Sequence, residues 1–158
     1  MTPLAREEAG DPSAPLVVVV HGSMDRSAGM LRLSRRLDGR YRDARYDRRG
    51  YGRSFPHDGP FDMVAQVADL VAVMAGRRAL LIGHSYGGNV ALATAARHRD
   101  LVAGVAIYES PMSWETWWPG TTAGAAAVAT QGEPADAAEL FMRLDRRLPL
   151  GGVASAHT

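Results

Sequence analysis

The chain has 158 residues, 46% of them hydrophobic and 22% charged, which suits one globular domain with a hydrophobic core and argues against a disordered chain. It contains no Cys, which excludes disulfides, thiolate metal sites and a cysteine nucleophile. The formal net charge is +1, and the 18 basic residues, all Arg, are scattered among 17 acidic residues. Without a basic patch, nucleic-acid binding is disfavoured.

No apolar run in the sequence approaches the roughly 20 residues that are needed to cross a bilayer. The N-terminus also lacks a basic segment followed by an apolar one, which a secretory signal would require. We therefore expect a cytoplasmic protein without a membrane partner.

The first predicted strand covers residues 16–20, a continuous and mostly β-branched run that is typical of a strand buried on both faces. Apolar residues at helical spacing then predict a helix over residues 27–37. A short strand is expected at 42–46. It leads into a loop at 47–54 that is rich in Gly and Arg.

Helical spacing returns over residues 61–74, and a second buried strand follows at 79–82. The next helix is expected at 89–96 and a further apolar strand at 101–108. Strands and helices that alternate at these intervals indicate crossover units, which build a mostly parallel sheet with helices on both faces. The fold class is therefore predicted to be α/β.

The sequence changes character after Pro111, where three Trp residues are followed by a run of small residues and a predicted helix at 135–148. Residues 151–158 show no periodicity and are expected to be loose. We therefore expect a core over residues 1–111 and a separate helical segment over 112–158.

The pentapeptide from Gly83 to Gly87 matches Gly-x-Ser-x-Gly, with Ser85 at its centre. A predicted strand leads into it and a predicted helix leads out, which is the setting of a nucleophile elbow. The glycines are needed because the serine occupies a strained turn packed closely against its neighbours. The N–H groups of the following helix then lie near the serine oxygen and can stabilise an anion.

A second element, His21-Gly22-Ser23-Met24, ends the first buried strand. Parallel strands end at the same edge of a sheet, so this loop is expected beside Ser85. The N–H of Tyr86 and an N–H from Ser23 or Met24 would together form an oxyanion hole.

These two motifs and the loop at 47–54, in this order and spacing, resemble the α/β-hydrolase superfamily over residues 4–118, in its esterase, lipase and perhydrolase-like branches. The resemblance implies a three-layer α/β fold with a mostly parallel sheet. It implies Ser85 as nucleophile and Tyr86, Ser23 and Met24 as oxyanion donors. The Asp and Arg of the loop would organise the sheet edge and take no catalytic role.

The segment that begins at 112 resembles the start of the cap that members of this superfamily insert above the site. Trp114 and Trp117 would then border a small hydrophobic acyl substrate, and the alternative is that they only pack the cap. We expect no cofactor, and no set of His and carboxylate residues has the spacing of a metal site.

The acid and the histidine of the family's triad should follow Ser85, yet only 73 residues do. We therefore expect an N-terminal portion or a truncated member that ends before its acid and histidine and whose fold is incomplete on its C-terminal side. Within the chain, two weaker candidates remain. The candidate acid is Glu109, with a role as a cap hinge as the alternative. The candidate base is His157, although no apolar strand precedes it. His84 is expected to pack structurally, and His21 to hydrogen-bond the oxyanion loop.

The resemblance has a further consequence for the strand at 101–108, which is interior in the complete fold. Here it would be an exposed apolar edge that allows self-association.

Together, the motifs and the family resemblance predict a serine hydrolase that acts on an ester or related carbonyl compound. The alternative is a non-catalytic binding protein of the same fold or an inactive fragment.

Overall fold

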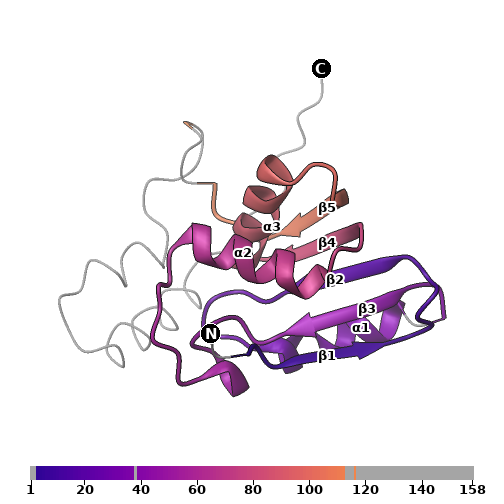
Figure 1. Cartoon of the computed structure of the whole chain (residues 1–158), viewed down its shortest axis with the longest axis horizontal. Helices are drawn as coiled ribbons and strands as arrows, with labels where there is room; N and C mark the ends of the chain where they lie inside the picture. Colours follow the sequence, from indigo (N-terminus) through magenta and orange to yellow (C-terminus); the bar gives the residue numbers. More distant parts are fainter. Residues whose placement is uncertain (1–2, 38, 113–115, 117–158) are drawn as a thin grey trace, which may run out of the picture. The chain divides into compact units, whose positions relative to one another are not determined.

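The computed structural model describes residues 3–37, 39–112 and 116 of the chain (Figure 1). Its strands form one sheet in the order β1-β3-β2-β4-β5, and every neighbouring pair is parallel except β1 and β3. The strands are β1 (Arg6–Ala9), β2 (Leu16–Val20), β3 (Arg42–Tyr46), β4 (Ala79–His84) and β5 (Val102–Tyr108). The helices are α1 (Leu31–Leu37), α2 (Met63–Met74) and α3 (Tyr86–Arg97). All of them lie in one unit of the chain, Met1–Met112.

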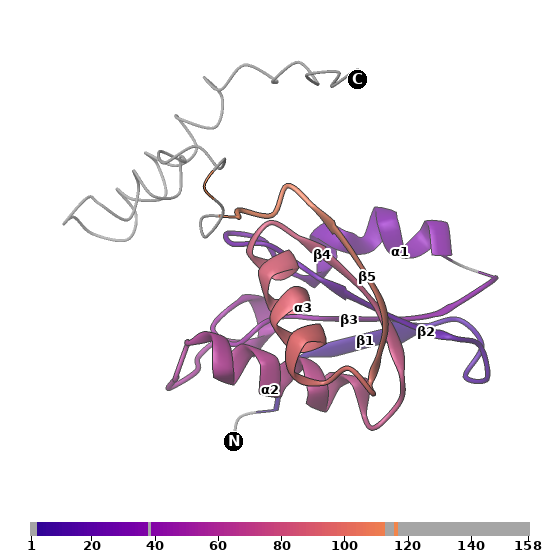
Figure 2. The ribbon, with the colours of Figure 1, turned by 90° about the horizontal axis from the view of Figure 1, so that it is seen from above.

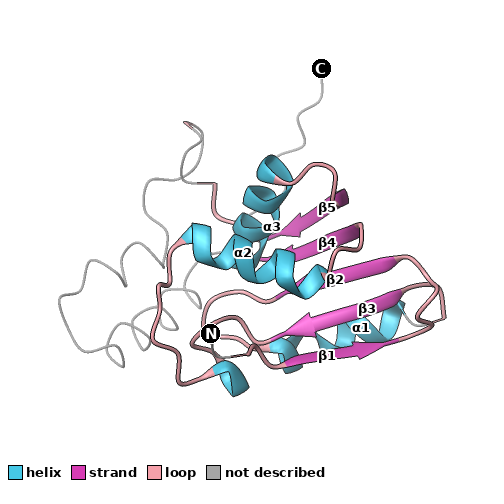
Figure 3. Ribbon diagram, viewed as in Figure 1, coloured by secondary structure: helices cyan, strands magenta, loops and turns pink. Residues whose placement is uncertain are grey.

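These elements confirm the predicted α/β class and the predicted order of strands and helices (Figure 3). Their boundaries differ most at the helix starts. The helix predicted over 27–37 begins as a 3-10 turn, Ser27–Met30, before α1. α3 starts at residue 86 rather than 89, so Gly87 and Gly88 already lie in its first turn.

Strand β1 was not predicted, because its four residues, Arg-Glu-Glu-Ala, carry no apolar pattern. It pairs antiparallel with β3, which places Glu7 opposite Arg45 and Glu8 opposite Ala44. Glu7 forms an ion pair with Arg45, and Glu8 forms one with Arg42. Cross-strand charge pairs therefore replace apolar burial at this charged edge of the sheet.

Helices cover both faces of the sheet, as the view from above shows (Figure 2). On one face α1 and the turn before it pack against Val17 and Val19 of β2. On the other face α2 and α3 pack against Val18 and Val20. Because β2 is buried on both sides, its five residues are at most 3% exposed. This burial explains why its sequence is apolar throughout rather than alternating.

The helices that follow the neighbouring strands β2 and β4 lie on opposite faces of the sheet, α1 on one and α3 on the other. Such a divergence opens a crevice at the carboxyl ends of the two strands, where ligands bind in open α/β sheets. Val20 pairs with Gly83 at that end. The two loops singled out in the sequence therefore begin at the crevice.

Within residues 3–37 and 39–112, β5 forms the edge of the sheet opposite β1. Its side chains are mostly half-buried or exposed, and Tyr108 is 41% exposed. No helix of the described residues is both long and apolar enough to span a membrane.

Candidate active site

Ser85 lies on a sharp turn between β4 and α3. Its backbone has φ 50° and ψ −127°, a conformation that residues with a side chain rarely adopt. The turn is held by its own hydrogen bonds, since the N–H of Ser85 donates to the carbonyl oxygen of Tyr108 at 3.0 Å and the N–H of Gly88 donates to the carbonyl oxygen of Ser85 at 2.9 Å. This is the geometry that the sequence motif predicted.

Gly87 lets the first turn of α3 lie directly against the end of β2. A Cβ on this residue would collide with the carbonyl oxygens of Val20 and His21. Since backbone atoms cannot move aside as a flexible side chain can, only glycine fits there. The close approach brings the start of α3 against the loop that follows β2.

Gly22, in that loop, faces the serine directly. A Cβ built on Gly22 would lie 3.0 Å from Cβ of Ser85 and 3.1 Å from Nδ1 of His84. The loop after β2 therefore runs beside the serine, as expected. Of the two residues that follow, Ser23 shares a cavity with Tyr86, and Met24 has a positive φ of 59° with a side chain 48% exposed.

His21 and Arg48 connect this loop to the loop after β3. The backbone N–H of Arg48 donates to Nε2 of His21 at 3.0 Å, so the imidazole proton resides on Nδ1, which donates to the carbonyl oxygen of Gly22 at 2.8 Å. Burial, and after it the positive charge of Arg48, lower the pKa of His21 to about 4. His21 is therefore neutral near pH 7 and acts as a structural link.

The side chain of Arg48 is 1% exposed and reaches the same loop. Its Nε donates to the carbonyl oxygen of His21 at 3.0 Å, and one terminal nitrogen donates to the carbonyl oxygen of Gly22 at 3.0 Å. The other terminal nitrogen donates to Oε1 of Gln66 at 3.3 Å. The guanidinium also lies 4.5 Å from the ring centroid of Tyr51 and 5.0 Å from that of Tyr86.

The neighbours of Arg48 in the chain hold the loop after β3 in place. The side chain of Asp47 accepts the N–H of Ser27 at 2.7 Å and that of Arg53 at 3.0 Å. Burial acts to raise the pKa of Asp47, but these hydrogen bonds together outweigh it and leave the pKa lowered. Arg49 forms a two-pronged ion pair with buried Asp69, with both N···O distances at 2.6 Å.

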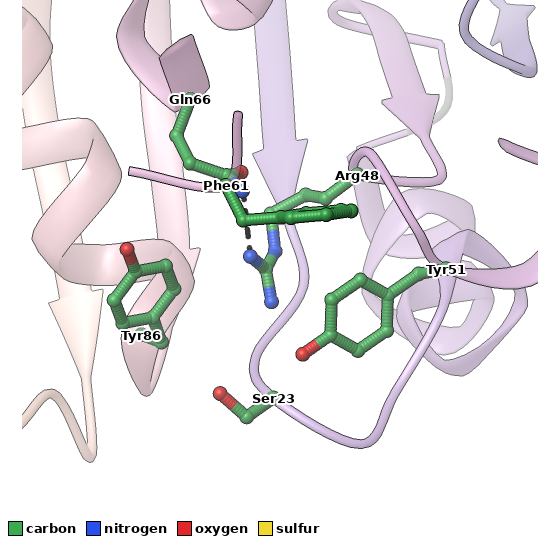
Figure 4. A pocket seen from close by; sticks show the side chains of 6 residues that line it. All are labelled: Ser23, Arg48, Tyr51, Phe61, Gln66 and Tyr86. Carbon is green, nitrogen blue, oxygen red and sulfur yellow. Dashed lines mark hydrogen bonds between the residues drawn. The ribbon is translucent and has the colours of Figure 1, made fainter. Parts of the chain in front are cut away.

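A cavity of about 300 Å³ lies at this edge of the sheet. Its lining residues are Ser23, Arg48, Tyr51, Phe61, Gln66 and Tyr86. Figure 4 shows the Arg48 guanidinium reaching into the space between Tyr51 and Tyr86, with Ser23 beyond its end. The volume is at the small end of the range for ligand pockets, and three of the six lining side chains are aromatic.

Glu109 follows β5 with a positive φ of 52° and a side chain that is 79% exposed. Its Oε2 accepts from Nε2 of His84 at 3.1 Å, and the His84 ring stacks on Tyr108 with 4.7 Å between centroids. In the described residues the candidate acid thus contacts the histidine beside Ser85 in the chain. His157, Trp114 and Trp117 lie outside the described residues.

Sequence reasoning missed the cavity's wall residues Tyr51, Phe61 and Gln66, and treated Arg48 only as part of a structural loop. One signal was present. Gln66 is a polar residue on the face of α2 that also carries buried Leu70 and Val73. The same buried face carries Asp69, and each of these polar side chains requires a buried partner. The partner is the guanidinium of Arg48 for Gln66 and that of Arg49 for Asp69. Among the described residues, no cluster of His, Asp and Glu could hold a metal ion.

Comparisons with a family model and with solved structures both indicate the alpha/beta hydrolase family. Residues 17–156 match the family described as alpha/beta hydrolase. The chain is 33% identical over 96 residues to 2-(acetamidomethylene)succinate hydrolase of Mesorhizobium japonicum, covering 59% of this chain and 34% of that protein. It is 45% identical over 73 residues to pimeloyl-[acyl-carrier protein] methyl ester esterase of Photorhabdus laumondii, covering 45% of this chain and 27% of that protein. It spans about a third of the length of these relatives.

Solved structures share the fold. An alpha/beta hydrolase from Sphaerobacter thermophilus superposes with a TM-score of 0.69 at 29% identity, over 90% of this chain and 56% of that one. The enol-lactonase from Burkholderia xenovorans superposes with a TM-score of 0.61 at 29% identity, over 65% of this chain and 41% of that one. The fold described above is therefore shared with a protein named as an alpha/beta hydrolase and with one named as an enol-lactonase.

Proposed function

Because this chain belongs to the alpha/beta hydrolase family, we propose that it carries the nucleophile and the oxyanion hole of a serine hydrolase for esters or related carbonyl compounds. The relatives and structural neighbours include an esterase and an enol-lactonase by name. The observation that carries the proposal is the strained backbone of Ser85, φ 50° and ψ −127°, beside the loop at Gly22. Strain of this kind is retained where it aims a reactive side chain.

In the first half of the proposed reaction, Oγ of Ser85 attacks the carbonyl carbon of the substrate. The hydroxyl proton passes to a general base, and the carbonyl π electrons move to the oxygen, which becomes an oxyanion. The N–H of Tyr86 and an N–H from Ser23 or Met24 are the proposed donors to that oxyanion. Such fixed donors contribute about 2.7–4 kcal/mol each to the stability of the transition state.

In the second half, the oxyanion collapses and the bond to the leaving alcohol breaks as the base returns its proton to that alcohol. A water molecule, deprotonated by the same base, then attacks the acyl-serine ester and releases the acid and free Ser85. Within the described residues, His84 contacts Glu109 and His21 is held by Arg48 and Gly22. His57 accepts the N–H of Gly59 through its Nδ1, and His98 lies at the end of α3 opposite to Ser85. The proposal therefore takes its base from elsewhere, and His157 is the histidine of residues 113–158.

The test is pre-steady-state release of p-nitrophenol from p-nitrophenyl acetate by the full chain. A burst of about one equivalent per chain is expected from acylation of Ser85. Ser85→Ala abolishes the burst, whereas Ser23→Ala retains it because only the backbone N–H of Ser23 is invoked. A chain that is folded yet shows no burst contradicts the proposal and favours a non-catalytic binding protein of the same fold.

The base and the acid are assigned by the same burst in two further variants. If His157 is the base, His157→Ala slows the burst by about a hundredfold or more while the amount of folded protein is unchanged. Glu109→Gln removes the charge facing His84 but keeps the size of the side chain. An unchanged burst in Glu109→Gln excludes Glu109 as the acid and leaves it as a partner of His84.

A further inference from the structure

Arg48 is a buried cation for which the described residues supply no carboxylate. Its side chain is 1% exposed, and no Asp or Glu among residues 3–37 and 39–112 lies within ion-pair distance of it. The next residue, Arg49, shows the usual arrangement, since it is also buried, at 5% exposed, and is paired with Asp69. Buried charges in proteins are normally paired in this way, because an unpaired one is costly.

The guanidinium of Arg48 also carries N–H groups that have no acceptor among the described residues. A guanidinium carries five N–H groups, and the described residues accept three of them, through the carbonyl oxygens of His21 and Gly22 and the amide oxygen of Gln66. Two N–H groups on the terminal nitrogens therefore remain without an acceptor among these residues. Every hydrogen-bond acceptor that is present is neutral, so among these residues only the rings of Tyr51 and Tyr86 stabilise the positive charge, and no anion pairs with it.

The cavity borders this charge. Arg48 forms part of the wall between the rings of Tyr51 and Tyr86, and Figure 4 shows its guanidinium directed toward Ser23. Ser23 and Phe61 are exposed lining residues, so the cavity opens to solvent beside them. The three aromatic rings of the lining can accommodate a short apolar chain.

We propose that the cavity binds a substrate that carries a carboxylate, with Arg48 as the counter-ion of that carboxylate. This inference rests on the proposed function in that the cavity is taken as the substrate site. A planar carboxylate matches the fork of a guanidinium and can accept the two remaining N–H groups together. The specific substrate class is then a short acyl ester with an acidic group, rather than a neutral ester.

The test compares two small probes of nearly equal shape, butyrate and butyramide, bound to the full wild-type chain. Binding is followed by ¹H–¹⁵N NMR at low ionic strength and about pH 8, where His21 is neutral. Butyrate is expected to bind at least about tenfold more tightly than butyramide, because charge-assisted hydrogen bonds are about twice as strong as neutral ones. It should shift the Nε–H of Arg48 and the amides of Ser23 and Tyr86.

Variants test whether the preference for butyrate depends on Arg48. Arg48→Met removes the charge and is expected to abolish the preference for butyrate, whereas Arg48→Lys keeps the charge without the fork and retains part of it. The matched control is Arg36→Met, which removes an exposed arginine of α1 and should leave the preference unchanged. If Arg48→Met does not fold, the wild-type comparison and Arg48→Lys decide the question.

Equal affinity for the two probes, shifts confined to other parts of the chain, or a preference that persists in folded Arg48→Met would each overturn the proposal. The Ser85→Ala variant distinguishes failure of the carboxylate site from failure of the proposed hydrolase function. It cannot form an acyl-enzyme, yet it should bind butyrate as the wild type does. Butyrate binding without a catalytic burst would support the carboxylate site and contradict the hydrolase. A burst without preferential binding of butyrate would support the hydrolase and contradict the carboxylate site.

Discussion

His21 and Arg48 hold each other through two hydrogen bonds of 3.0 Å, one from the backbone N–H of Arg48 to Nε2 of His21 and one from Nε of Arg48 to the carbonyl oxygen of His21. The pair ties the loop after β3 to the loop after β2, which runs beside Ser85. The first bond requires a lone pair on Nε2. It is therefore lost if the imidazole of His21 gains a second proton.

The first prediction concerns stability against pH. The folded pKa of His21, about 4, lies below its ordinary value of 6.5, so the unfolded chain binds the proton more tightly. The stabilisation is complete above about pH 6.5 and falls as the pH is lowered toward 4, by about 3 kcal/mol in all. Urea unfolding at a series of pH values measures this slope.

The control for the first prediction is His21→Gln, which cannot titrate. Its free energy of unfolding should be lower than that of the wild type near pH 8 but should change less between pH 6.5 and 4. A wild-type stability that stays flat over this window would contradict the neutral, buried state of His21. Loss of stability below about pH 4 reports instead on carboxylates such as Asp47, whose pKa is lowered.

The second prediction concerns the strain at Ser85. Glycine adopts φ 50° and ψ −127° without the steric cost that any Cβ incurs. Ser85→Gly should therefore be more stable than Ser85→Ala by about 1 kcal/mol, although both variants lack the nucleophile. Paired urea titrations give the difference, and a Gly variant no more stable than the Ala variant would show that the turn is unstrained.

The third prediction concerns the close packing of α3 on β2. Gly87→Ala places a methyl group against the carbonyl oxygens of Val20 and His21 and should cost about 3 kcal/mol or more, since backbone atoms cannot yield. The matched control is Gly104→Ala in β5, where the new methyl would contact only the mobile end of Leu80. Thermal or urea unfolding compares the two, and equal losses would contradict the packing described.

The fourth prediction contrasts two ion pairs. Asp69→Asn leaves the buried guanidinium of Arg49 without its carboxylate and should lower the free energy of unfolding by about 3–5 kcal/mol. Arg6→Met removes a partly exposed ion pair with Glu8, which keeps its second ion pair with Arg42, and should cost at most about 1 kcal/mol. Denaturant unfolding measures both. Similar losses for the two variants would mean that burial does not determine how much these ion pairs contribute to the free energy of unfolding.

Much of this fold could be predicted from the sequence because its central strands are buried on both faces. Apolar runs such as Leu16–Val20 leave few other interpretations, and the glycines around Ser85 mark a turn that few other residues allow. Strand β1 escaped prediction because its pairing depends on charges supplied by Arg42 and Arg45, more than thirty positions away.

The site was predictable only in part. Ser85 and the loop at Ser23 lie at the ends of predictable strands, so the common edge of a parallel sheet places them together. The cavity walls depend instead on how loops fold, and no local pattern places Phe61 beside Arg48. The polar residues Gln66 and Asp69 on the buried face of α2 were the hint that charged partners lay beneath them.

The most direct test of the central claim is covalent labelling of the full chain with a fluorophosphonate, followed by mass spectrometry of its peptides. The account predicts one adduct, on Oγ of Ser85, that is absent from Ser85→Ala and retained in Ser23→Ala. A folded chain that gains no adduct, or one labelled equally at other serines, would contradict the claim that Ser85 is the nucleophile of a hydrolase.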